Sequence, residues 1–343
     1  MGWNPRAHAG YTVAVDKDVS LQVVPMRTKH ITATIDLDHI RANAERIRAH
    51  TRVPVVAVIK ADAYGLGAAR VADAIASAVD DFAYFYVSEA REVGRPGLVI
   101  GPPEDDPSEY RELGLRPSIG SLRDAERFRG MRVAVTVDTG MQRFGCDPGE
   151  LDALLEAVAT DEIHTHAANL DAVERFVGVV GGRPLRKLCA CTAMLECREA
   201  WLDGVRPGIG LYRGSTRVST RLYTVRDTQG PIGYTGFVAP RVGVILGGYT
   251  NRIAPGAPVI INGRRQSILE TGMNSSYVSV EPGDRPGDEV VLLGDGLTEA
   301  EVGSALNVRE HEVLCRYGAA GVRAYCTGSL HSTAVQGATC AAK

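Results

Sequence analysis

The 343-residue chain lacks the sequence features that indicate a membrane, secreted, nucleic-acid-binding or zinc-binding protein. No apolar run approaches the roughly 18–20 residues that span a bilayer, and residues 1–18 lack the continuous apolar segment of a signal peptide. A net charge of −3 gives no electrostatic reason to expect a nucleic acid or an anionic membrane as partner. The seven cysteines are scattered, and the close pair Cys189/Cys191 has no second pair to complete a zinc site. We therefore expect a cytoplasmic protein without membrane, nucleic-acid or metal partners.

Lysine is also rare, since only five of the 38 basic residues are lysines. One of them, Lys60, ends the apolar run PVVAVIK (54–60), which reads as a buried strand. An amine can lose its proton when desolvated and can form a Schiff base, whereas a guanidinium can do neither. The alternative is a lysine that extends to the rim of the fold to keep its charge in water. On the strand alone, the two interpretations are about equally good.

The first half of the chain alternates between two periodicities. Strand patterns at 30–36, 54–59, 82–87, 97–101, 117–121, 132–138 and 162–167 alternate with helical patterns at 37–50, 68–79, 88–93, 122–128 and 148–159. This alternation indicates βαβ units with a parallel sheet, and so many repeats favour closure into a (β/α)₈ TIM-type barrel. Functional groups of such barrels follow the strands, as Lys60, Asp138 and His166 do, which favours a functional Lys60.

After about residue 215 the helical pattern nearly vanishes and strands punctuated by Gly, Pro and Asn-Gly predominate. We therefore predict an α/β protein in which a mostly β C-terminal domain follows the barrel. The predicted divisions are an irregular extension (1–29), the barrel (30–214), the β domain (215–325) and a poorly ordered tail (326–343).

Several motifs, in order, resemble the alanine racemases, which use pyridoxal 5′-phosphate (PLP). They are AVIKADAYGLG (57–67), VDTGMQRFG (137–145), THAAN (165–169), GVRPGIGLY (204–212), IGYTG (232–236) and the GDEVVLLG and HEVLC segments. The resemblance covers roughly residues 30–325. It implies a homodimer with shared active sites that interconverts L- and D-alanine by proton transfer at Cα.

The resemblance also implies a role for individual residues. Lys60 would carry PLP and act as one base, and Tyr234, from the partner subunit, would act as the other. The cofactor phosphate would be bound by Tyr64, Thr192 and the backbone of Gly208 and Ile209. Arg206 would face the pyridine nitrogen and hydrogen-bond to His166, while Arg143, Tyr249 and Met273 would bind the substrate.

Some positions depart from the family pattern. Glu270 reverses the charge of the family's Gly-Arg-x-x-Met-Asp segment, Cys191-Thr192 replaces an Asn-Ser pair, and Thr136 replaces a frequent lysine. The register of a late phosphate-binding tyrosine falls on Ala319. These changes leave three other hypotheses open: a racemase of serine or another small amino acid, a PLP decarboxylase or lyase, and a non-catalytic PLP-binding protein. A barrel enzyme without PLP is more remote.

Overall fold

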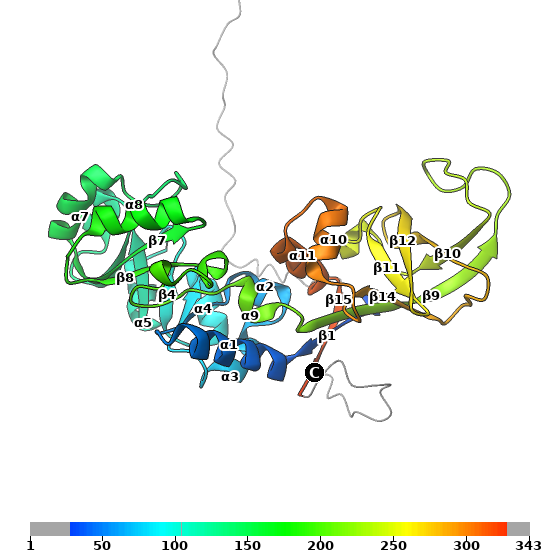
Figure 1. Ribbon diagram of the computed structural model, residues 1–343, viewed down its shortest axis with the longest axis horizontal. Helices are drawn as coiled ribbons and strands as arrows, with labels where there is room; N and C mark the ends of the chain where they lie inside the picture. The colour runs from blue at the N-terminus through cyan, green and yellow to red at the C-terminus, as the bar shows by residue number, and fades with distance from the viewer. Residues whose placement is uncertain (1–27, 104, 328–343) are drawn as a thin grey trace, which may run out of the picture.

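The computed structural model describes residues 28–103 and 105–327 (Figure 1). The predicted N-terminal extension and C-terminal tail lie outside these residues, apart from 28–29 and 326–327, of which 28, 29 and 326 belong to strands. Within the described part, no helix is both long and apolar enough to cross a membrane.

A seven-stranded parallel sheet forms the first body of the fold, with its strands in sequence order. They are β2 (Val56–Val58), β3 (Asp81–Tyr84), β4 (Gly97–Val99), β5 (Leu115–Ile119), β6 (Arg132–Thr136), β7 (Ala159–Ala167) and β8 (Arg186–Ala190). Val205 makes parallel bridges to both Val55, beside β2, and Ala190 in β8. The segment around Val205 therefore closes the circle as an eighth, very short strand, in agreement with the predicted barrel.

Among the described residues, nine helices precede, connect or follow the barrel strands (Figure 1). They are α1 (Leu37–Thr51), α2 (Lys60–Gly65), α3 (Ala68–Ile75), α4 (Val87–Val93), α5 (Pro107–Glu112), α6 (Leu122–Arg127), α7 (Leu151–Ala157), α8 (Leu170–Val180) and α9 (Ile209–Tyr212). Five of them, α1, α3, α4, α6 and α7, match the predicted helical patterns. Short 3₁₀ turns occur at Pro148–Glu150, Thr192–Met194, Arg198–Ala200 and Tyr249–Asn251. Side chains cap the N-termini of α1, α5, α6 and α8; Asp36, for example, accepts a hydrogen bond from the backbone N–H of His39.

An eight-stranded sheet forms the second body, in the order β10-β13-β12-β11-β14-β9-β1-β15. Its strands are β1 (Thr28–Asp36), β9 (Thr216–Asp227), β10 (Arg241–Ile245), β11 (Pro258–Ile261), β12 (Arg264–Thr271), β13 (Ser276–Ser279), β14 (Glu289–Leu293) and β15 (Gly321–Cys326). Two helices that the sequence pattern did not predict, α10 (Glu299–Leu306) and α11 (Glu310–Tyr317), lie between β14 and β15. Figure 1 shows α11 on the side of this domain that faces the barrel.

The first strand lies in a different sheet from the one we predicted. Residues 30–36 belonged to the predicted barrel segment, but β1 pairs in parallel with β15 and antiparallel with β9. Its buried side chains, Ile31, Ala33 and Ile35, alternate as expected for a strand. Alternation reveals which face is buried, but it does not identify the partner strands, which are distant in sequence.

Candidate active site

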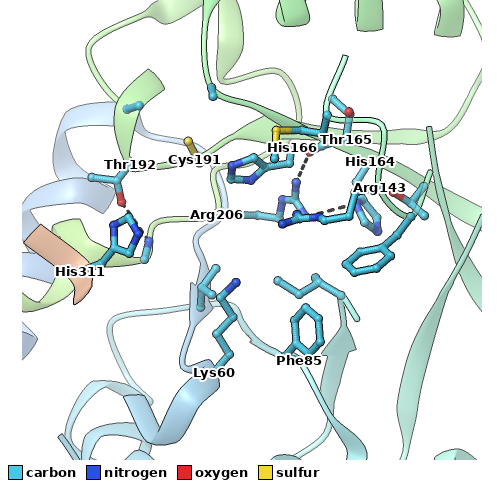
Figure 2. A pocket seen from close by; sticks show the side chains of 18 of the residues that line it. Lys60, Phe85, Arg143, His164, Thr165, His166, Cys191, Thr192, Arg206 and His311 are labelled. Carbon is cyan, nitrogen blue, oxygen red and sulfur yellow. Dashed lines mark hydrogen bonds between the residues drawn. The ribbon is translucent and has the colours of Figure 1, made fainter. Parts of the chain in front are cut away.

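A cavity of about 460 Å³ lies where the barrel strands end and their following loops begin. Most of the residues predicted for the site line it, and Figure 2 shows several of them. These are Lys60, Tyr64, Arg143, His166, Thr192, Arg206, Gly208 and Ile209. Three other predicted residues, Tyr234, Tyr249 and Met273, belong to the β domain and do not line this cavity among the described residues.

Lys60 enters the cavity two residues after β2 ends, with its amine 5.5 Å from the centre of the Phe85 ring. Burial, followed by the positive charge of Arg143, lowers the pKa of the Lys60 amine below its usual 10.5. Glu89 partly opposes this shift. Because a lower pKa increases the fraction of unprotonated amine, Lys60 has the environment that a nucleophile or a base needs.

The residues after Lys60 form an unusual left-handed turn. Ala61, Asp62, Ala63 and Tyr64 all have φ between 52° and 58°, a conformation that costs L-residues roughly 1–2 kcal/mol each. Contacts from outside the turn stabilise it, since the backbone N–H of Ala61 donates to Glu89 at 2.6 Å and Asp62 pairs with Arg323 of β15 at 2.6 Å. The turn carries the Tyr64 side chain back into the cavity beside Lys60.

Backbone donors and hydroxyl groups converge at another part of the cavity. The Thr192 hydroxyl oxygen accepts hydrogen bonds from the N–H groups of Gly208 at 3.0 Å and Gly210 at 3.1 Å. A Cβ atom on Gly208 would overlap the Tyr64 hydroxyl, so a larger residue at this position would force Tyr64 to move. Main-chain N–H groups and hydroxyls in this arrangement form a cradle suited to an anion such as a phosphate.

Arg206 is the buried cation of the cavity, with 6% of its surface exposed. One terminal nitrogen, Nη2, donates to the carbonyl of Thr165, and Nη1 lies 3.2 Å from Nδ1 of His164 (Figure 2). Its third nitrogen, Nε, is buried without a hydrogen-bond partner among the described residues. A buried donor in this state needs an acceptor, and a ligand in the cavity can supply one.

The hydrogen-bonded histidine differs from the one we predicted. We assigned His166 as the partner of Arg206, but the hydrogen bond found here joins Arg206 to His164, two residues earlier on β7. His166 lies on the cavity wall, where partial burial and the charges of Arg206, Arg143 and Lys60 lower its pKa to about 4. Its imidazole is therefore neutral at pH 7.

Arg143 lies on a loop that Asp138 organises. The two carboxylate oxygens of Asp138 accept the N–H groups of Gly140 at 2.7 Å and Arg143 at 3.0 Å. The Arg143 guanidinium stacks over Phe144, 4.9 Å from the ring centre, and lines the cavity. It is therefore a candidate to bind an anionic group of a ligand.

Sequence analysis missed part of the cavity wall. Arg309, His311 and Cys315, from helix α11 and the residue before it, line the cavity opposite the barrel strands. The signal was present in the matched HEVLC segment, but the register pointed further along the chain to Ala319. Tyr317, which is also nearby in sequence, is buried and does not line the cavity.

The three β-domain residues gather at a separate place, around Gly272. The N–H of Tyr249 donates to the carbonyl of Gly272 at 3.0 Å, and Met273 is the next residue. A Cβ atom built on Gly272 would lie 3.5 Å from the Tyr234 ring. All three side chains are open to solvent, with exposed fractions of 90% for Tyr234, 55% for Tyr249 and 57% for Met273. They form a solvent-facing group, separate from the cavity, in this chain.

Known proteins match both the sequence and the fold. The sequence pattern described as "Alanine racemase, N-terminal domain" matches residues 35–216. The alanine racemase of Thioalkalivibrio sulfidiphilus is 32% identical over 83% of this chain and 96% of its own length. That of Rhodospirillum rubrum is 30% identical over 85% of this chain and 95% of its own.

Solved structures extend the similarity to the whole architecture. The biosynthetic alanine racemase of Pseudomonas aeruginosa superposes with a TM-score of 0.79 at 27% identity, covering 87% of this chain and all of that one. The alanine racemase of Bartonella henselae, solved with covalently bound pyridoxal phosphate, has a TM-score of 0.80 at 24% identity over the same shares. Both bodies of the fold are therefore accounted for, and the chain belongs to the alanine racemase family.

Proposed function

We propose that this protein is a PLP-dependent amino-acid racemase that interconverts L- and D-alanine. The observation that carries the proposal is the cavity that combines Lys60, whose pKa is lowered, with the buried Arg206, whose Nε has no partner among the described residues. Membership of the alanine racemase family and the PLP bound covalently in the Bartonella henselae relative support this choice.

The cavity residues fit the parts of PLP. Lys60 would bind the aldehyde carbon covalently, and the cradle of Tyr64, Thr192, Gly208 and Ile209 would bind the phosphate. Arg206 would donate from Nε to the pyridine nitrogen, which the guanidinium cannot protonate because arginine keeps its protons in proteins. When bound, PLP withdraws electrons from the substrate Cα and makes its hydrogen acidic.

Racemisation needs a proton acceptor and a proton donor on opposite faces of Cα. Lys60 would remove or return the proton on one face, because burial and Arg143 favour its neutral amine. Tyr234 would serve the other face, and Arg143, Tyr249 and Met273 would hold the substrate carboxylate. His166, neutral at pH 7, would stay beside Arg206 without adding a charge.

The separation of Lys60 and Tyr234 leads us to propose a homodimer, and the free cysteines of the described residues support a reducing, cytoplasmic setting. Tyr234 is 90% exposed and does not line the cavity among the described residues, so it would act on the PLP of a partner subunit. We propose that residues 30–214, apart from β1, hold the cofactor and that 215–325 supply the second base.

The test measures two independent properties. Wild-type protein incubated with PLP should absorb near the visible edge, and borohydride should abolish this band and attach the cofactor to Lys60. Incubation in D₂O with L- and D-alanine, followed by NMR, should show deuterium at Cα and both enantiomers as products. A clear preference for serine would change the substrate, whereas CO₂ release or an unchanged Cα hydrogen would contradict a racemase.

A further inference from the structure

Glu270, near the end of β12, is a buried carboxylate at which the sequence departs from the family pattern. Only 6% of its surface is exposed. The family segment has an arginine here, so the charge at this position is reversed. A buried carboxylate is costly unless hydrogen bonds satisfy it, and therefore its partners indicate what it does.

Glu270 accepts hydrogen bonds from two residues of the loop that carries Tyr234, the proposed second base. Its Oε1 accepts the backbone N–H of Tyr234 at 2.8 Å. Its Oε2 accepts the backbone N–H of Thr235 at 2.7 Å and the Thr235 hydroxyl at 2.5 Å. These three hydrogen bonds lower the pKa of Glu270, with the Thr235 hydroxyl as the largest cause, so the group stays ionised.

The loop backbone is shaped to receive this carboxylate. Gly233 has φ of +71°, and a Cβ atom there would overlap Glu270 Oε1. The loop lies between β9 and β10 and projects from the end of the β domain far from the barrel (Figure 1). The Glu270 carboxylate ties this projecting loop to β12, whose end is followed directly by Gly272 and Met273.

We propose that Glu270 is a positioning residue for Tyr234, which holds the phenol in the orientation needed to reach Cα in the partner's site. This inference rests on the proposed function, in which Tyr234 is the second base. The chemistry requires a carboxylate, because three donors converge on two acceptor oxygens. Glutamine has one acceptor oxygen and would direct its NH₂ at a donor, and arginine has no acceptor.

The main experiment compares Glu270→Gln with Glu281→Gln, a control on the same domain that accepts a hydrogen bond from Gln266. Glu270→Gln should keep PLP absorbance but lose roughly 10–100-fold in racemisation, the range expected when a reacting group is displaced by up to about 1 Å. Cα–deuterium exchange without inversion should persist for the enantiomer whose proton Lys60 takes. Glu281→Gln should retain wild-type rates.

A double-variant comparison separates positioning from general damage. If Glu270 acts through Tyr234, Glu270→Gln should cause no further loss of Lys60-side exchange in a Tyr234→Phe background. Equal losses in both backgrounds, or loss of Lys60-side exchange in the single variant, would mean a merely structural role. Thr235→Val, which removes one donor, gives a milder version of the same test if Glu270→Gln does not fold.

Amide hydrogen exchange separates the positioning role of Glu270 from the role of Tyr234 as the second base. Faster exchange at residues 234–235 in Glu270→Gln, together with unchanged racemisation, would overturn the positioning role but leave Tyr234 as a base. Full racemisation by Tyr234→Phe alone would remove the second base itself, and the positioning role with it.

Discussion

Arg206 and His164 are joined by a buried hydrogen bond of 3.2 Å between Nη1 and Nδ1. Because arginine keeps its protons, Nδ1 of His164 must be the acceptor, and the ring proton therefore lies on Nε2. That nitrogen is 2.8 Å from the Ser118 hydroxyl, to which it donates. Burial, then the charges of Arg206, Arg116 and His166, lower the pKa of His164 well below 6.5. The two hydrogen bonds that link Ser118, His164 and Arg206 thus fix the orientation of the guanidinium through a neutral imidazole.

This arrangement predicts that the cofactor-free protein loses stability in acid. The unfolded chain binds a proton at His164 near pH 6.5, whereas the folded chain resists protonation to well below that pH. Stability is therefore greatest above pH 6.5 and falls as the pH drops, by up to about 1.4 kcal/mol per pH unit for each such group. His164→Asn, which keeps an acceptor for Arg206, should flatten this slope in urea unfolding between pH 5 and 8. His166 should leave a residual slope, because burial and nearby positive charges lower its pKa as well. An unaltered slope in His164→Asn would contradict the neutral assignment.

Lys60→Ala should abolish both the PLP absorbance and racemisation, since the proposed attachment needs this amine. The matched control is Lys187→Ala, because the Lys187 amine donates to the carbonyl of Arg183 on the barrel and does not line the cavity. That variant should keep wild-type absorbance. Borohydride reduction followed by peptide mapping identifies the modified residue, and labelling of Lys17, Lys29, Lys187 or Lys343 instead would disprove the assignment.

Arg206→Glu should change the type of reaction as well as its rate. A carboxyl group facing the pyridine nitrogen would let that nitrogen carry a proton, which strengthens electron withdrawal and prolongs the life of the carbanion. We expect slower racemisation together with transamination, measured as pyruvate formed from alanine. Arg206→Lys, which keeps the positive charge but lacks Nε, should slow racemisation without this side product. If Arg206→Glu makes no more pyruvate than the wild type, Arg206 does not face the pyridine.

Tyr234→Phe should retain PLP, because the phenol is far from the cavity of its own chain. Racemisation should fall by at least the roughly 10²–10⁴-fold that a positioned acid–base group provides. Mixing this variant with Lys60→Ala should restore part of the activity, since one site of the heterodimer would have both bases and the other neither. A mixture that stays inactive after proven subunit exchange would exclude shared sites.

Local pattern was sufficient to predict most of the barrel and to place Lys60, Asp138 and His166 at the ends of its strands, whereas the resemblance to the alanine racemases supplied the other predicted cavity residues. The alternation of short apolar strands with helical periods predicted the βαβ architecture, and the position of Lys60 at a strand end pointed to the cavity. These features are local, because hydrophobic periodicity and turn residues determine helices and strands through neighbours in the sequence. The alternation also placed His166 correctly on the cavity wall.

Long-range pairing decided what local pattern could not. Residues 30–36 alternate identically whichever sheet they join, and only the distant strands β9 and β15 determine that they lie in the second one. Arg206 bonds to His164 although His166, two residues later, has the same strand parity, so the partner depends on the position along β7 that lies opposite the segment after Val205. In the sequence, Glu270 is only a reversal of the family's charge. The fold brings its carboxylate to the N–H groups of Tyr234 and Thr235, which lie 35–36 residues earlier in the chain. Sequence alone determined the types of residue present, and the tertiary structure determined their partners, because a hydrogen bond depends on distance in space.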